Sequence, residues 1–357
     1  MLALAVVAAL VFGEVGCSGG GLEATGQGGA GGDRERSGAR ATEGAGSTIE
    51  DELGHQAFQP STRLVVPAEE GEAFDRTARV LAGLSEGPLG ARVFVDQRPG
   101  EGGGLAWRDV ADEEPDGHQL AYVTEGLLAS GRSGSGAVGA GDFEMVAQTD
   151  AGSAVLVAKG DPEVETLQWE DFEELEDLVG AAEEDPGLVE VADPGAGTVY
   201  RAGTLALERE AGIDLAEKSP ANKSPVQAVH DSDVEAALVP LDAGVLADVW
   251  AGELLPIAVF GEEPAAGLPK VPTARELGYD VSVPVVGGIA APSGTPPKVV
   301  DELGRVFVGA SSSRVFGKVL VGTGREPMQR GPEEFARYLE EQSRLLSKAS
   351  PETEEGE

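Results

Sequence analysis

The sequence predicts an α/β protein whose parallel sheets are covered by helices on both faces. Short apolar segments alternate along the chain with segments whose apolar residues recur at helical spacing, and this alternation is typical of βαβ units. Hydrophobic residues make up 41% of the composition and charged residues 25%, as in an ordinary folded globular chain. The length of 357 residues corresponds to about two domains of the usual size.

The expected elements follow one another from residue 61 onward. Strands are expected where short apolar runs occur, at residues 64–66, 92–95, 119–123, 154–157, 188–191, 236–239, 255–259 and 285–290. Helices are expected where apolar residues recur at three- and four-residue spacing, at residues 74–84, 167–178, 199–210, 225–230, 298–308 and 332–346. In the last of these helices, Phe335, Leu339 and Leu346 form one apolar stripe.

The N-terminal segment, residues 1–17, has the features of a lipoprotein-type signal. Residues 2–12 are continuously apolar, which is too short for a membrane span of about 20 residues but suits the apolar core of a secretion signal. The only cysteine, Cys17, stands where such a signal carries its lipidated residue. Glu14 replaces the usual leucine, and no basic residue precedes the apolar run, so an incidental cysteine without a lipid is the alternative.

Two further segments are expected to lie outside the fold. Residues 18–59 are rich in glycine, alanine, serine and charge, and they contain too few large apolar side chains to offset the entropy of ordering. We therefore expect a disordered, glycine-rich tether. Residues 349–357 form an acidic tail.

The charge and the rare residue types exclude several functions. The chain has 63 acidic and 26 basic residues, and its net charge of −37 repels the phosphates of nucleic acid. One cysteine and three scattered histidines (His55, His118 and His230) do not indicate a metal site. P-loop, H-E-x-x-H and C-x-x-C motifs are absent, so neither a cofactor nor an enzymatic activity is expected. The charge is typical of a protein in a saline exterior, where salt screens self-repulsion.

Six motifs occur in order along the predicted fold. They are RLVVP (63–67) with a loop through Gly71 to Asp75, QRPGEGG (97–103), PDGH (115–118), GAGT (195–198), LPKVPTARELG (268–278) and APSGTP (291–296). From about residue 62 to 346, the chain resembles the substrate-binding proteins of tripartite tricarboxylate transporters, the TctC or Bug family. The resemblance implies a two-lobed, periplasmic-binding-protein-like (type II) fold with a ligand cleft between the lobes.

The resemblance also implies the organisation of the chain and its partners. Residues 60–158 and 285–348 are expected to form lobe 1, and residues 159–284 lobe 2. The implied protein is a monomeric extracytoplasmic receptor, either periplasmic or lipid-anchored through Cys17 to the outer face of the cell membrane. It would bind a small carboxylate solute and deliver this solute to membrane permease subunits.

The candidate ligand-binding residues lie in two glycine-bearing loops that each precede a helix. Free backbone amides and the positive end of a helix dipole suit a carboxylate, and glycine allows a close approach of the backbone. The set is Pro67, Ala68, Gly71, Ala73, Phe74, Asp75, Gly195, Ala196, Gly197 and Thr198. An ordinary helix-start role for Asp75 and a turn-shaping role for residues 98–100 are the alternatives to a direct role in binding.

Three glutamates depart from the family pattern in the first loop. Glu69, Glu70 and Glu72 stand where the family has Pro, Pro and Gly. Two like charges about 4 Å apart cost about 4 kcal/mol at an effective dielectric constant of 20, so these side chains either point outward or the ligand is not a simple dicarboxylate. A sensory receptor for a cationic or zwitterionic solute and an acidic surface protein without a ligand are therefore alternatives.

Overall fold

The computed structural model describes residues 61–130, 138–160, 174–195, 198–220 and 222–349, all within one compact unit, Ser47–Glu357. The predicted signal segment with Cys17, the tether, and residues 350–357 of the acidic tail lie outside the described residues. Among the described residues, no helix has both the length and the apolar character needed to cross a membrane.

The first sheet has six strands in the order β11-β4-β10-β3-β1-β2. These strands are β1 (Ser61–Val66), β2 (Arg92–Gln97), β3 (Gln119–Thr124), β4 (Phe143–Gly152), β10 (Val285–Pro292) and β11 (Arg325–Arg330). Strand β1 pairs in parallel with β2 and β3, whereas β10 is antiparallel to β3 and β4, and β11 is antiparallel to β4.

The second sheet has five strands in the order β7-β6-β8-β5-β9. These are β5 (Ala154–Lys159), β6 (Glu190–Ala192), β7 (Ala216–Lys218), β8 (Ala236–Pro240) and β9 (Leu254–Val259). Strand β6 is parallel to β7 and β8, whereas β5 is antiparallel to β8 and β9.

The expectation of parallel sheets was wrong, because both sheets are mixed. Strand β4 runs into β5 with only Ser153 between them, so this connection contains no helix and leads from the first sheet directly into the second. Strand β5 therefore belongs to the second sheet, although the expected first lobe included residues 154–158. Every expected strand overlaps an observed one, whereas β4, β7 and β11 were not expected.

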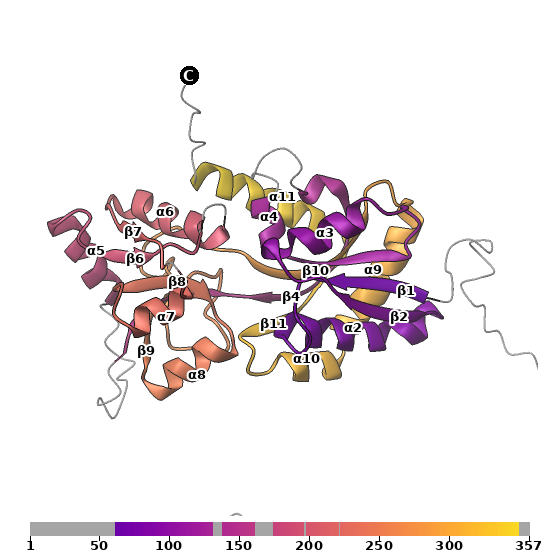
Figure 1. Ribbon diagram of the computed structural model, residues 1–357, viewed down its shortest axis with the longest axis horizontal. Helices are drawn as coiled ribbons and strands as arrows, with labels where there is room; N and C mark the ends of the chain where they lie inside the picture. Colours follow the sequence, from indigo (N-terminus) through magenta and orange to yellow (C-terminus); the bar gives the residue numbers. More distant parts are fainter. Residues whose placement is uncertain (1–60, 131–137, 161–173, 196–197, 221, 350–357) are drawn as a thin grey trace, which may run out of the picture. The chain divides into compact units, whose positions relative to one another are not determined.

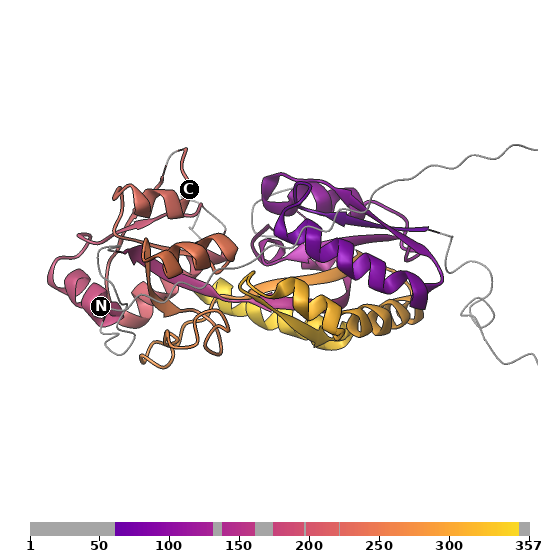
Figure 2. The same ribbon diagram turned by 90° about the horizontal axis from the view of Figure 1, so that it is seen from below.

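Ten α-helices are described. Figure 2 shows that helices lie around both sheets. The helices are α2 (Ala73–Leu89), α3 (Gly104–Ala111), α4 (Gly126–Ser130), α5 (Glu174–Glu184), α6 (Val199–Ala211), α7 (Pro225–His230), α8 (Ala243–Ala251), α9 (Pro297–Ser311), α10 (Arg314–Leu320) and α11 (Pro332–Ala349). Helices α3, α4, α8 and α10 were not expected. The first residues of the helix expected over 167–178 lie outside the described residues, and α5 covers the remainder.

Alternate residues of β1 contact two different hydrophobic clusters, one on each face of the first sheet. Leu64 and Val66 pack with residues of α2, α9 and α10. Val65 belongs to the other cluster, which also contains Trp107 of α3 and Phe335 of α11. Figure 1 shows α2 and α10 on one side of this sheet and α3 on the other. Both faces are therefore covered, and the end of β1, where the first predicted loop begins, lies between two layers of helices.

Candidate functional site

The loop between β1 and α2 is organised around Asp75. This residue lies on the first turn of α2 and is only 1% exposed. Its carboxylate accepts hydrogen bonds from the Gly71 amide at 2.8 Å, from Arg79 Nε at 3.0 Å and from Gln97 Nε2 at 2.6 Å. Gly71 has a φ of +85°, which glycine adopts without strain. Asp75 thus connects the loop, the helix and the end of β2.

The first turn of α2 presents free backbone amides. Within the described part of the chain, the amides of residues 73–75 have no acceptor, as is normal at the start of a helix. The Glu69 amide, in contrast, donates to the Glu72 carboxylate at 2.9 Å. Glu69, Glu70 and Glu72 are all exposed to solvent. Three donors at the positive end of a 17-residue helix therefore remain for an anion.

The other predicted residues of this loop differ in their accessibility. Ala68 is 1% exposed and packs in a hydrophobic cluster, whereas Pro67, Ala73 and Phe74 are half-buried. The Phe74 ring lies 5.6 Å from the ring of Tyr122, centroid to centroid. Phe74 is therefore the predicted residue that connects this loop to the polar groups described below.

The second predicted loop precedes α6. Gly195 has a φ of +109°, and its amide donates to Asp193 Oδ1 at 2.8 Å. Thr198 caps α6, because its Oγ1 accepts from the Arg201 amide at 3.2 Å while donating to the Gly195 carbonyl at 3.0 Å. The single hydroxyl hydrogen of Thr198 is thus used within the loop. Two members of the predicted set, Ala196 and Gly197, lie outside the described residues.

A buried ion pair lies in the first sheet, and the sequence did not indicate it. Arg325 Nε donates to Asp150 Oδ1 at 2.5 Å, and the two side chains are 8% and 0% exposed. Asp150 Oδ2 also accepts from Tyr122 Oη at 2.7 Å and from Thr149 Oγ1 at 2.9 Å. A Cβ atom at Gly287 would lie 2.5 Å from both carboxylate oxygens of Asp150, so the close approach requires glycine there.

Glu125 connects the surroundings of this ion pair to the start of α6. Its Oε1 accepts from Tyr200 Oη at 3.0 Å, and its Oε2 accepts from the Val286 amide at 3.2 Å. Tyr200 is the second residue of α6, so the two predicted loops lie near one group of polar side chains. We call this group the central cluster; its members are Phe74, Tyr122, Glu125, Asp150, Tyr200 and Arg325.

Burial and neighbouring charges shift pKa values in the central cluster. Burial raises the pKa of Tyr122 well above its ordinary value, and the charge of Asp150 raises it further. Burial and the charge of Glu125 do the same to the pKa of Tyr200. Burial alone would lower the pKa of Arg325, but the attraction of Asp150 outweighs it and raises this pKa. At neutral pH the cluster therefore contains two neutral phenols and a charged guanidinium.

The motif at residues 97–103 makes contacts that shape a turn. Arg98 forms ion pairs with Asp96 at 2.9 Å and with Asp109 at 3.3 Å. Gly103 has a φ of +105°, and a Cβ atom there would lie 2.6 Å from Cη2 of Trp107. These contacts support the turn-shaping role for this segment.

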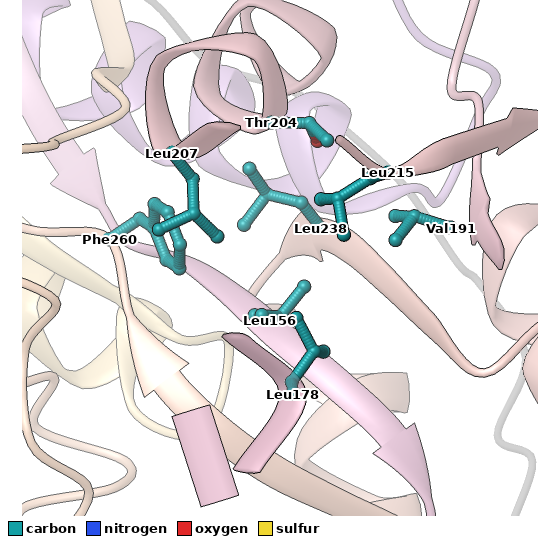
Figure 3. A pocket seen from close by; sticks show the side chains of 8 residues that line it. All are labelled: Leu156, Leu178, Val191, Thr204, Leu207, Leu215, Leu238 and Phe260. Atoms are coloured by element: carbon teal, nitrogen blue, oxygen red, sulfur yellow. The ribbon is translucent and has the colours of Figure 1, made fainter. Parts of the chain in front are cut away.

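A small cavity lies in the hydrophobic core of the second sheet (Figure 3). Its volume is about 10 Å³, and its lining side chains are Leu156, Leu178, Val191, Thr204, Leu207, Leu215, Leu238 and Phe260. This volume is at most that of one water molecule, and the lining offers almost no polar partner. The cavity is therefore a packing defect and not a solute site.

Among the described residues, one group has the composition of a metal site. His230, Asp248 and Glu253 place one potential ligand atom each within 4.8 Å of one another. His230 Nε2 already lies 3.1 Å from Asp248 Oδ2, which is an ordinary side-chain pair. Glu253 is exposed, and exposed carboxylates are frequent in a chain with 63 acidic residues.

We expect Asp75 to make the stability of the protein depend on pH at the acidic end. Burial alone would raise its pKa, but the hydrogen bonds from Gly71, Arg79 and Gln97 outweigh this effect and hold the pKa below the usual value. Because the folded-state pKa is depressed, the contribution is complete above the unfolded pKa of about 3.9 and is lost as pH falls through the folded value.

The measurement is urea unfolding of the wild type and of Asp75→Asn between pH 7 and pH 3. The variant should be less stable at pH 7, and the difference should shrink as pH falls below about 4. Asp301→Asn, at an exposed site on α9, is the matched control and should show no such convergence. A constant difference between wild type and Asp75→Asn would contradict the assignment.

The chain is similar to a family of receptors over most of its folded part. The model of the family described as "Tripartite tricarboxylate transporter family receptor" matches residues 77–349. Among curated proteins, the "UPF0065 protein in gbd 5′ region" of Cupriavidus necator is 28% identical over 293 residues, covering 79% of this chain and 84% of that protein. "Protein BugT" of Bordetella pertussis is 26% identical over 281 residues, with 78% and 84% covered.

Solved structures share the fold. A TctC solute-binding protein from Polaromonas has a TM-score of 0.68 at 23% identity, covering 81% of this chain and 97% of that chain. MatC from Rhodopseudomonas palustris, solved with bound malate, has a TM-score of 0.62 at 25% identity, with 82% and 100% covered. A second R. palustris protein, solved with adipate, has a TM-score of 0.65 at 23% identity, with 81% and 96% covered. The expected two-lobed, periplasmic-binding-protein-like α/β fold is thereby confirmed.

Proposed function

The chain belongs to the tripartite tricarboxylate transporter family of receptors, which are solute-binding proteins and not enzymes, and we propose that it binds a small carboxylate-containing solute outside the cytoplasm. In this proposal the solute lies between the start of α2 and the start of α6, and the protein delivers it to membrane permease subunits. The contributing residues are those of the two predicted loops, Pro67, Ala68, Gly71, Ala73, Phe74, Asp75, Gly195, Ala196, Gly197 and Thr198.

The observation that carries the proposal is the set of free amides at residues 73–75. They lie at the positive end of α2, beside the half-buried Phe74, where an anion gains both hydrogen bonds and the helix dipole. The ligands of two similar proteins, malate and adipate, are both carboxylates and support this class of solute. Glu69, Glu70 and Glu72 in this loop could be expected to repel an anion. All three are exposed, however, and solvent screens exposed charges.

We further propose that each sheet, with its helices, forms one lobe. Lobe 1 would comprise residues 60–152 and 285–348, and lobe 2 residues 154–284, because β5 pairs in the second sheet. The chain would then cross between lobes at Ser153 and near residue 284. Two short crossings of this kind allow hinge closure around a solute.

A thermal-shift screen tests the proposed function. The panel contains monocarboxylates, such as butanoate and hexanoate, dicarboxylates, such as succinate, malate and adipate, and amines without a carboxylate, such as putrescine. A bound solute at about 100 times its dissociation constant should add about 2.7 kcal/mol to the free energy of unfolding. Stabilisation by carboxylates supports the proposal. Stabilisation by amines alone would favour a receptor for cations, and no stabilisation at all would favour an acidic surface protein.

A lipid anchor on Cys17 is part of the proposal and has its own test. If Cys17 is lipidated, Cys17→Ala should move the protein from the membrane fraction to the soluble fraction of the producing cells. Ser18→Ala, at the neighbouring position, is the matched control and should leave the protein with the membrane. An unchanged membrane fraction for Cys17→Ala would rule out the anchor.

A further inference from the structure

The guanidinium of Arg325 has an unused donor in the central cluster. Its Nε is paired with Asp150, but its Nη2 is buried and has no hydrogen-bond acceptor in the described part of the chain. The side chain is only 8% exposed, with the Phe74 ring 5.1 Å from Cζ. That ring offers a π face and no lone pair. A buried charged donor without an acceptor is rare in folded proteins and indicates a partner that the described residues do not supply.

The neighbourhood of this donor indicates an oxygen anion as the partner. Phe74 belongs to the same helical turn as the free amides of residues 73–75, so Arg325 approaches the very turn that carries these amides. A guanidinium and backbone amides are the donor types that bind a carboxylate most strongly, and an arginine fork matches the two carboxylate oxygens.

The charges of the central cluster limit the number of carboxylates that the solute can carry. Arg325 contributes one positive charge, while Asp150 and Glu125 contribute one negative charge each, so the cluster is net negative by one. The two tyrosines, Tyr122 and Tyr200, are neutral. A first carboxylate would pair with Arg325, whereas a second one would find no further cation in the central cluster and would be repelled by the negative charges of Asp150 and Glu125.

Resting on the proposed function, we propose that the solute carries one carboxylate, that Arg325 binds this carboxylate through Nη2, and that Asp150 and Glu125 exclude a second. The solute class is therefore monocarboxylates. An ammonium group at the other end of the solute is compatible with Glu125, which is half-buried and retains free lone pairs beyond its bonds to Tyr200 and Val286.

Two matched series of probes test the charge rule. The first is hexanoate, 6-aminohexanoate and adipate, and the second is butanoate, 4-aminobutanoate and succinate; within each series only the terminal group changes. In each series, calorimetry should show that the dicarboxylate binds about 10-fold or more weakly than the tighter-binding of the two monocarboxylates. Glu125→Gln should narrow this difference, because it removes one of the two repelling charges.

Variants of Arg325 test the direct contact. Removing Arg325 alone leaves Asp150 buried without its partner, so the comparison is made in a neutral background, Asp150→Asn against Asp150→Asn/Arg325→Gln. The second variant should bind the monocarboxylate about 10- to 100-fold more weakly than the first. Arg330→Gln, on the same strand but bonded to Gln148, is the matched control and should bind as the wild type does. Circular dichroism checks that each variant is folded.

The outcomes separate this inference from the proposed function. Equal affinity of the two Asp150→Asn variants overturns the inference, since the bound carboxylate then gains nothing from Arg325. Preference for adipate or succinate over their monocarboxylate partners also overturns it, yet leaves a carboxylate receptor intact. Binding of none of the six probes, together with a negative carboxylate screen, overturns the proposed function as well.

Discussion

Replacing Arg325 with alanine is expected to lower the free energy of unfolding by about 3–5 kcal/mol, because it leaves the buried Asp150 carboxylate without its counter-ion. Tyr122 and Thr149 would still donate hydrogen bonds to Asp150, but neither carries a positive charge. The loss therefore measures an uncompensated charge inside the first sheet. Urea unfolding at neutral pH is the measurement.

The double variant Asp150→Asn/Arg325→Met should recover most of this loss, because removing both charges leaves no buried ion to solvate. Arg275→Ala is the matched control: Arg275 also pairs with an acidic residue, Asp280, but both side chains of this pair are exposed. Exposed pairs contribute little to stability, so the control should change the unfolding midpoint only slightly. A loss for Arg325→Ala as small as that of Arg275→Ala would show that the Arg325–Asp150 pair is not buried in solution.

The sequence predicted the elements whose residues carry one clear pattern. The strand ending at Val66, the loop and α2 were all expected, because an apolar run, a glycine-bearing loop and helical spacing follow one another there. Asp75 was in the candidate set because it follows the first glycine-bearing loop. Its three hydrogen bonds involve neighbours up to 22 residues away, and these became visible only in the fold.

Strands β4 and β11 were not predicted because several of their residues are polar. The same polar residues form the buried contacts that the sequence did not indicate. Gln148, Thr149 and Asp150 are polar but fully buried in β4, so the apolar pattern of a central strand is interrupted there. Strand β11 consists mostly of charged and polar residues, with a proline that an edge strand tolerates. Two of the polar residues of β4, Gln148 and Asp150, bond to arginines of β11, more than 170 residues further along the chain.

Apart from Phe74, which was in the candidate set, the members of the central cluster could not be predicted from local patterns for the same reason. Its members come from separate elements, and each of them taken alone looks like a surface residue or a core aromatic. Arg325 and Asp150 lie 175 positions apart and meet because β11 and β4 are neighbours in the sheet. Without an observed strand order, the sequence offers no way to pair this arginine with this aspartate.

The residue before β11, Gly324, is a second position where the fold depends on a contact between distant segments. Gly324 has a φ of +72°, and a Cβ atom there would overlap the carbonyl oxygen of Leu241 and lie 2.7 Å from its carbonyl carbon. Leu241 follows β8 of the second sheet, and its amide donates to the Ser153 carbonyl at 2.9 Å. The contact is therefore between backbone and backbone, next to the crossing from β4 to β5, and no side-chain rotation can relieve it.

Gly324→Ala should consequently lower the free energy of unfolding by about 2–5 kcal/mol, the sum of a left-handed backbone strain of about 1–2 kcal/mol and an overpacking cost of about 1–3 kcal/mol. Gly322→Ala provides the matched control, since Gly322 has a φ of +77° but a Cβ atom there would have no neighbour within 4 Å, so this variant incurs only the strain. The difference between the two variants in urea unfolding isolates the contact with Leu241. Because that contact joins the strand carrying Arg325 to the second sheet, Gly324→Ala should also weaken solute binding, whereas Gly322→Ala should not. Equal stability of the two variants would show that the backbone of β11 does not approach Leu241 closely in solution.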